Sequence, residues 1–206
     1  MPGANPGAGG RSPLHWIWIC DVSDSMNLDG KIATLNEAIQ GGLAELVKFS
    51  EEKDINILVH TLKFSSGAEW MEKDFIPVKD YQWKNLKADG LTDLGEALSK
   101  IADVMMPGDE GGMMSDRCKL PHMILITDGY PTDDWESGLK RLIATSSGKN
   151  AVRMAVALPG ADLDVLKEFV GNVPEAEERL VDLSEDQSPT RLTACIINMS
   201  RIVCHP

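Results

Sequence analysis

The sequence lacks the features that assign many proteins to a class at first sight. No apolar run approaches the roughly 20 residues that a helix needs to cross a bilayer, so we expect no transmembrane helix. None of the four cysteines belongs to a CxxC pair, which disfavours a zinc finger, and a domain of 206 residues rarely depends on disulfides. Positive charge is scarce, with 20 Lys and Arg against 32 Asp and Glu. The resulting net charge of -12 argues against nucleic acid and anionic membranes as partners.

What is present fits a soluble protein with one α/β core. The hydrophobic content is 43% and the mean hydropathy is -0.16, as in a globular domain. Residues 1–13 are rich in Gly, Ala and Pro, carry one charge and lack the apolar core of a signal peptide. We therefore expect a flexible lead over 1–13, a single domain over 14–206 and a cytoplasmic location.

Apolar runs alternate with segments of helical periodicity along the chain. The short apolar runs predict strands at 14–20, 55–64, 122–127, 152–158 and 180–183, with a hairpin or edge strand in 68–78 that Pro77 helps to end. The periodic segments predict helices at 32–47, 94–105, 163–170 and 188–203. A further helix should begin at Asp133 or Asp134 and bury Trp135, Leu139, Leu142 and Ile143. This alternation predicts a three-layer, Rossmann-like, doubly wound α/β fold with a mostly parallel sheet and one antiparallel edge strand.

Polar oxygen-bearing side chains follow two of the predicted strands. Asp21, Ser23 and Ser25 come after the first strand, and alternate residues of an extended chain point to the same side. Asp128 follows the strand at 122–127, and Thr92 precedes the helix at 94–105. Because sites in such folds gather beyond the carboxyl ends of the strands, we expect these five side chains to share one edge of the sheet.

Five oxygen donors of this kind predict a site for a hard divalent cation. Carboxylates and hydroxyls suit Mg²⁺ best here, and Mn²⁺ or Ca²⁺ fit the same donors. Two carboxylates only just neutralise a dication, and hydroxyls add no charge. The ion should therefore keep a position for an outside anionic oxygen, such as an Asp or Glu side chain of a partner protein.

These segments resemble the metal-ion-dependent adhesion site (MIDAS) of von Willebrand factor A (vWA) domains. The match consists of DxSxS at Asp21, Ser23 and Ser25, Thr92 within GLTDLGEAL, and the TDG that contains Asp128. The resemblance implies a non-catalytic interaction module, with the hydroxyls as direct ligands and the two aspartates bound directly or through water. Asp24 departs from the DxSGS form of the family, which leaves the ligand preference open.

Longer stretches resemble one subfamily. DVSDSMNLDGKIATLNEAIQGGLAEL, LTDLGEAL and ITDGYPTDDW are most like the small bacterial vWA proteins of tellurium-resistance (TerY-type) operons. That resemblance implies a scaffold for stress-response proteins, including kinase or phosphatase components.

Other interpretations of the same residues stay open at this stage. Thr92 ahead of Asp93 and Glu96 also reads as a helix N-cap. An aspartate at a strand end also begins the site of haloacid-dehalogenase phosphotransferases, but that chemistry needs a second aspartate where Ser23 stands. A flavodoxin-like or receiver domain would bring a phosphate loop richer in glycine. Finally, a zinc site can be drawn from Cys195, Cys204 and His205.

Two expectations concern the surface around the metal loops. Loops beyond strand ends usually face solvent, so we expect Asp128 on a solvated rim, where its replacement weakens metal binding with little loss of stability. Tyr130 and Trp135 follow the same loop and are candidates for contact with a partner. The methionine-rich segment in 105–116 reads as a mobile connector.

Overall fold

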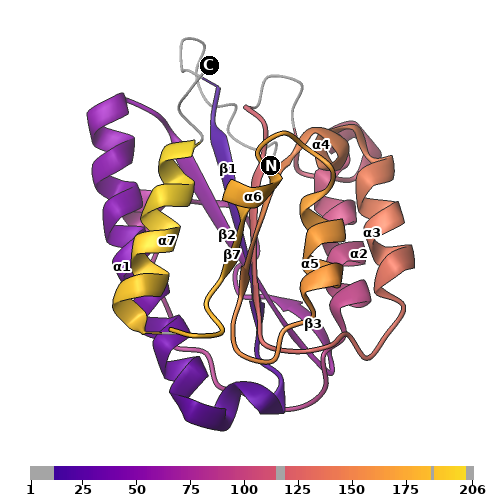
Figure 1. Ribbon diagram of the computed structural model, residues 1–206. Helices are drawn as coiled ribbons and strands as arrows, with labels where there is room; N and C mark the ends of the chain where they lie inside the picture. Colours follow the sequence, from indigo (N-terminus) through magenta and orange to yellow (C-terminus); the bar gives the residue numbers. More distant parts are fainter. Residues whose placement is uncertain (1–11, 115–118, 187, 203–206) are drawn as a thin grey trace.

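The computed structural model describes residues 12–114, 119–186 and 188–202. They form one seven-stranded sheet flanked by helices (Figure 1). The strands are β1 (Leu14–Asp21), β2 (Ile57–Ser65), β3 (Gly67–Trp70), β4 (Ile76–Pro77), β5 (His122–Thr127), β6 (Val152–Ala157) and β7 (Leu180–Asp182). The strands predicted from apolar runs are all present, with ends that differ by a few residues.

The sheet has the order β3-β2-β1-β5-β6-β7. β1 is parallel to both of its neighbours, β2 and β5, and the order continues in parallel through β6 to β7. The antiparallel edge consists of two short strands, because β3 and β4 pair with successive stretches of β2. The predicted doubly wound, mostly parallel sheet with an antiparallel edge is therefore confirmed.

Helices cover both faces of the sheet, with α1 and α7 on one side and α2, α3 and α5 on the other (Figure 1). The helices are α1 (Lys31–Lys53), α2 (Leu94–Met105), α3 (Trp135–Ala144), α4 (Ser146–Asn150), α5 (Leu163–Val170), α6 (Ala176–Arg179) and α7 (Pro189–Ile202), with the 3-10 helices η1 (Asp24–Gly30), η2 (Val78–Asp80) and η3 (Gly108–Glu110). None of the helices within the described ranges is long and apolar enough to span a membrane.

Alternation along β1 divides the core between the two faces. Trp16 and Trp18 pack with the residues of α1 and α7, whereas Ile17 and Ile19 pack with those of α2, α3 and α5. All four side chains are fully buried, and each large apolar side chain contributes about 1.5–3 kcal/mol on burial. A central strand buried on both faces explains why the segment is apolar almost without interruption.

Two glycines allow α2 and α3 to approach closely. A Cβ atom at Gly138 would lie 2.4 Å from the carbonyl oxygen of Gly95, and one at Gly95 would lie 2.5 Å from the carbonyl oxygen of Asp134. The start of α2 therefore lies against the loop that follows β5. Asp134 caps α3 through a hydrogen bond from Ser137 N (3.1 Å).

Some sequence expectations need correction or fall outside the described residues. Ile143 is 39% exposed and not buried, because it lies at the rim of a groove beside α3. η3 occupies part of the expected connector after α2. Three predicted segments extend outside the described residues. They are the lead (residues 1–11), the connector (115–116) and the end of the last helix (Val203).

The buried histidines predict that stability falls in acid. Burial lowers the pKa of His15 and His122 to about 4, from the usual value of 6.5. The unfolded chain therefore binds more protons than the native state between these values. The free energy of unfolding should fall as the pH drops from about 6.5 to about 4, by up to about 1.4 kcal/mol per pH unit for each histidine.

Urea unfolding across that pH window measures this loss. His122→Phe is the matched variant, because a phenyl ring can keep the stacking against Trp16, whose ring lies 6.0 Å from that of His122. This variant should show a shallower pH dependence than the wild type. An identical slope in the two proteins would mean that His122 does not contribute.

Candidate metal centre

The two aspartates emerge at the point where the order of the sheet reverses. The chain passes from β1 to β2 on one side, whereas β5 pairs with β1 on the other. Cys20 pairs with Ile126, so β1 and β5 end at the same level, with Asp21 as the last residue of β1 and Asp128 just after β5. Ligand sites of doubly wound folds lie at this kind of position.

The first loop folds its alternate side chains toward one point. Asp21 Oδ1 accepts a hydrogen bond from Ser23 N at 2.8 Å, and the Oγ atoms of Ser23 and Ser25 lie 3.1 Å apart. Asp21 and Ser23 are buried, at 0% and 2% exposure. The convergence predicted from the DxSxS spacing is therefore present.

The second loop is hydrogen-bonded directly to the first. Ser25 Oγ donates to Asp128 Oδ1 at 2.7 Å, across 103 positions of sequence. Thr127 Oγ1 donates to the other oxygen of Asp21, Oδ2. These bonds join Asp21, Ser23, Ser25 and Asp128 into one cluster of oxygen atoms.

Thr92 completes the cluster from a third segment. A Cβ atom at Gly129 would lie 3.4 Å from Thr92 Oγ1 and 3.8 Å from Asp21 Oδ2. The backbone of Gly129 therefore lies next to both side chains. Asp24 N donates to the carbonyl oxygen of Gly90 at 3.0 Å, which holds this segment against the first loop. The structure thus brings all five predicted residues to one place.

The backbone of Thr92 is fixed by the loop after β5. Thr92 N donates to Thr132 Oγ1 at 3.0 Å, and Thr132 N donates to the carbonyl oxygen of Thr92 at 2.9 Å. The N-cap interpretation of Thr92 is wrong, because the N-cap residue of α2 is Asp93. The side chain that accepts from the first N–H groups of α2 is Asp133, bonded to Gly95 N and Glu96 N at 2.8 Å each.

Sequence reasoning missed a sixth residue, Lys31. Its Nζ donates to Asp128 Oδ2 at 2.6 Å, and the two side chains are 7% and 0% exposed. Asp29 and Gly30, the last two residues of η1, have left-handed backbones (φ 52° and 73°), and Lys31 begins α1 directly after them. One signal was available, since a lysine in the first turn opposes the helix dipole and needs a compensating anion.

The expectation of a solvated rim for Asp128 is wrong. The residue is only 2% exposed and is held by Ser25 on one oxygen and Lys31 on the other. The carboxyl end of β5 therefore lies under the loops around it. Asp128 is therefore part of the protein interior as well as of the candidate site.

Burial and a neighbouring carboxylate set the electrostatics of Asp21. Burial raises the pKa of Asp21 and the charge of Asp128 adds to the rise, whereas hydrogen bonds from Ser23 and Thr127 oppose it. A dication placed among these oxygens would offset both causes of the rise. The donors are two carboxylates and three hydroxyls, which fits Mg²⁺, Mn²⁺ or Ca²⁺.

Within the described ranges, no group of three or more His, Cys, Asp or Glu side chains could hold a metal ion. The five-oxygen site falls outside that pattern because three of its donors are hydroxyls. Of the three residues of the alternative zinc site, the structure describes Cys195, which is a free, half-buried thiol. Cys204 and His205 lie outside the described residues.

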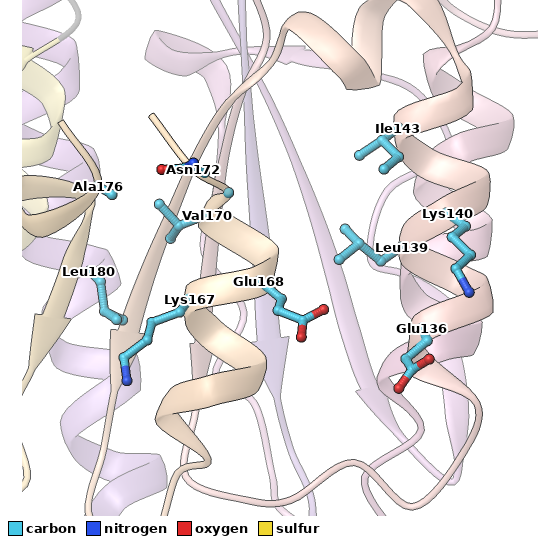
Figure 2. A pocket seen from close by; sticks show the side chains of 11 residues that line it. Glu136, Leu139, Lys140, Ile143, Lys167, Glu168, Val170, Asn172, Ala176 and Leu180 are labelled. Atoms are coloured by element: carbon cyan, nitrogen blue, oxygen red, sulfur yellow. The ribbon is translucent and has the colours of Figure 1, made fainter. Parts of the chain in front are cut away.

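A groove of about 640 Å³ lies elsewhere on the molecule, between α3 and α5 (Figure 2). Leu139 and Ile143 point from α3 toward α5, and Lys167 and Glu168 belong to α5. None of the five predicted ligands lines the groove, so it is separate from the metal loops.

Comparison with solved structures identifies the architecture. A von Willebrand factor type A protein from Catenulispora acidiphila superposes with a TM-score of 0.66 at 16% identity over 92% of this chain. The chain has the vWA fold. The ArnB paralog VWA2 from Sulfolobus acidocaldarius gives a TM-score of 0.58 at 16% identity, over 92% of this chain. No protein-family model and no curated sequence matches.

A third neighbour has the same fold and is known in a metal-bound form. Proximal thread matrix protein 1 of the mussel byssus, in a form with a zinc-occupied MIDAS motif, gives a TM-score of 0.61 at 17% identity over 93% of this chain. This chain spans 42%, 45% and 48% of the three solved chains, so each solved chain is longer than the part that this chain matches.

Replacement of Asp128 by Ala should destabilise the protein even in EDTA. The change leaves the Lys31 ammonium buried without its carboxylate, and breaking a buried pair in this way costs about 3–5 kcal/mol. Asp24→Ala is the control, because the exposed Asp24 side chain makes a single hydrogen-bond contact among the described residues, with Asn27 at 3.5 Å, and its loss should change stability by less than about 0.5 kcal/mol. Equal urea midpoints for wild type and Asp128→Ala would show that the pair contributes nothing.

Proposed function

We propose that this vWA domain is a non-catalytic, metal-dependent protein-interaction module. Asp21, Ser23, Ser25, Thr92 and Asp128 are its metal ligands, in the arrangement of a MIDAS. The proposal is supported above all by the hydrogen bonds that join the first loop to Asp128 at the reversal point of the sheet. A catalytic role of the haloacid-dehalogenase type lacks its general acid, because Ser23 stands in that place and its Oγ contacts Ser25.

The metal would capture an Asp or Glu side chain of the partner. Two carboxylates neutralise a dication, and three hydroxyls complete the protein's share of its coordination without adding charge. An outside carboxylate is then a favourable further ligand. The chain's own residues fix the position of the ion, and the ion supplies the attraction for the carboxylate.

Apolar side chains beside the metal loops support a protein as the partner. Leu28, Leu91 and Tyr130 are 60%, 57% and 67% exposed. Each follows or precedes a proposed ligand by one to three positions, so all three flank the site. Exposed apolar groups around a polar centre are typical of surfaces that bind another protein.

Mg²⁺ is the proposed ion, because all donors are hard oxygen atoms. The zinc in the mussel neighbour's site belongs to that protein, and its presence there supports only a divalent cation here. On the resemblance to TerY-type proteins, we further propose that the module acts in a bacterial tellurium-resistance or stress-response system in the cytoplasm. Its partners would then include kinase or phosphatase components.

Calorimetric titration of Mg²⁺ and Mn²⁺ tests the site. Asp21→Asn removes one of the two ligand charges and should weaken binding at least about tenfold. Asp182→Asn is the matched control, since Asp182 also ends a strand and accepts from the N–H two residues on (Ser184 N, 2.8 Å) but is exposed, and β6 separates its strand from β5. Unchanged affinity in Asp21→Asn would refute the ligand set. Metal-dependent hydrolysis of a generic phosphomonoester by the wild type would refute the non-catalytic role.

The apolar rim can be tested apart from the metal. The double variant Leu91→Ser/Tyr130→Ser should keep its Mg²⁺ affinity within about twofold, because neither side chain is a proposed ligand. It should lose most of the partner protein that the wild type retains from extracts of the source organism in Mg²⁺ and releases in EDTA. Full retention by the double variant would mean that the rim does not contact the partner.

A further inference from the structure

Lys31 occupies an unfavourable place that calls for a physical reason. It stands in the first turn of α1, where the helix dipole disfavours a cation, and its side chain is 93% buried. On the same helix, Lys48 shows the usual arrangement: it pairs with Glu45, and the two side chains are 64% and 35% exposed. The difference is that Lys31 reaches a carboxylate of the metal centre.

The contact determines the charge of the centre. Asp21 and Asp128 contribute two negative charges and Lys31 one positive charge, which leaves one net negative charge before any ion binds. A dication then brings the total to one positive charge. Without Lys31, the net charge would be two negative charges before the dication binds and zero afterwards.

The contact also concerns a ligand atom. Asp128 accepts from Ser25 on Oδ1 and from Lys31 on Oδ2, at 2.7 Å and 2.6 Å. An ion bound by Asp128 would therefore share that carboxylate with the ammonium group. Like charges at such short range repel each other even at an intermediate effective dielectric constant.

We propose that the Lys31 ammonium group competes with the metal ion for the Asp128 carboxylate. It thereby lowers the affinity of the site for the cation and raises the affinity of the metal-bound site for an anionic oxygen. This inference rests on the proposed function, because it assumes that Asp128 is a metal ligand. With Lys31 present, the site binds its cation only at a higher cation concentration than the five oxygen ligands alone would require. Its ligand preference is then set by an excess positive charge.

A purely structural role for Lys31 predicts a different result. If the lysine only stabilised Asp128, its removal would leave metal affinity unchanged or lower it, since the loop would be less ordered. Competition predicts the opposite change. Removal should raise metal affinity while it lowers the stability of the metal-free protein.

Calorimetric titration of Mg²⁺ and Mn²⁺ into the full chain separates these cases. Lys31→Met should bind both ions at least about tenfold more tightly than the wild type, which is about 1.4 kcal/mol. Lys31→Arg keeps the charge and should stay within about threefold of the wild type. Lys48→Met removes the same charge from an exposed pair on the same helix and should stay within about twofold.

Thermal unfolding provides a second readout. Lys31→Met should melt below the wild type in EDTA and should gain more in melting temperature from saturating Mg²⁺. If Lys31→Met does not fold in EDTA, Lys31→Gln takes its place, because the amide can still donate to Asp128 without the charge. A smaller gain than that of the wild type would contradict competition.

The effect on anions is measured with acetate as the probe for an Asp or Glu side chain. Acetate titrated into the Mn²⁺-loaded protein displaces water from the ion, which changes the relaxation of water protons. The wild type should bind acetate several-fold more tightly than Lys31→Met. Equal affinities would overturn this half of the proposal.

The outcomes separate the inference from the function on which it rests. If the wild type binds neither Mg²⁺ nor Mn²⁺, the proposed function fails and the inference fails with it. If the wild type binds them and Lys31→Met binds no more tightly, only the role of Lys31 is refuted.

Discussion

The parallel pairing of β1 with β5 is the constraint on which the rest of the molecule depends. It brings together two strands that are separated by about half of the chain, and it ends them at the same level. The order of the sheet reverses at this pair, so the helices that follow β1 and β5 leave on opposite faces. The two loops therefore have room at the edge of the sheet, and their aspartates become neighbours.

Two buried carboxylates at one place are costly, and the surrounding residues can be understood as compensation. Hydrogen bonds from Ser23 and Thr127 stabilise the charge of Asp21, and Ser25 and Lys31 do the same for Asp128. Burial nevertheless raises the pKa of Asp21. The compensation is thus incomplete at Asp21, and a positive charge nearby would favour the ionised carboxylate.

The third segment of the site depends on helix packing. Gly95 and Gly138 let α2 and α3 approach until Asp133 accepts the first N–H groups of α2. The same approach lets Thr132 bond with the backbone of Thr92. Thr92 is therefore held by the loop that carries Asp128, so the two ligands are positioned together.

Local pattern alone determined the fold class, the approximate bounds of most elements and the five oxygen-bearing residues. Apolar runs, helical periodicity and the alternation of Asp21, Ser23 and Ser25 are properties of short segments, and they hold wherever the segments lie. The burial of Asp128 and its pairing with Lys31 were decided only by the tertiary structure. The two residues are 97 positions apart, and a left-handed turn at Asp29 and Gly30 brings α1 back to the end of β5. Whether a charged side chain meets solvent or another charge depends on what packs over it, and no short segment contains that information.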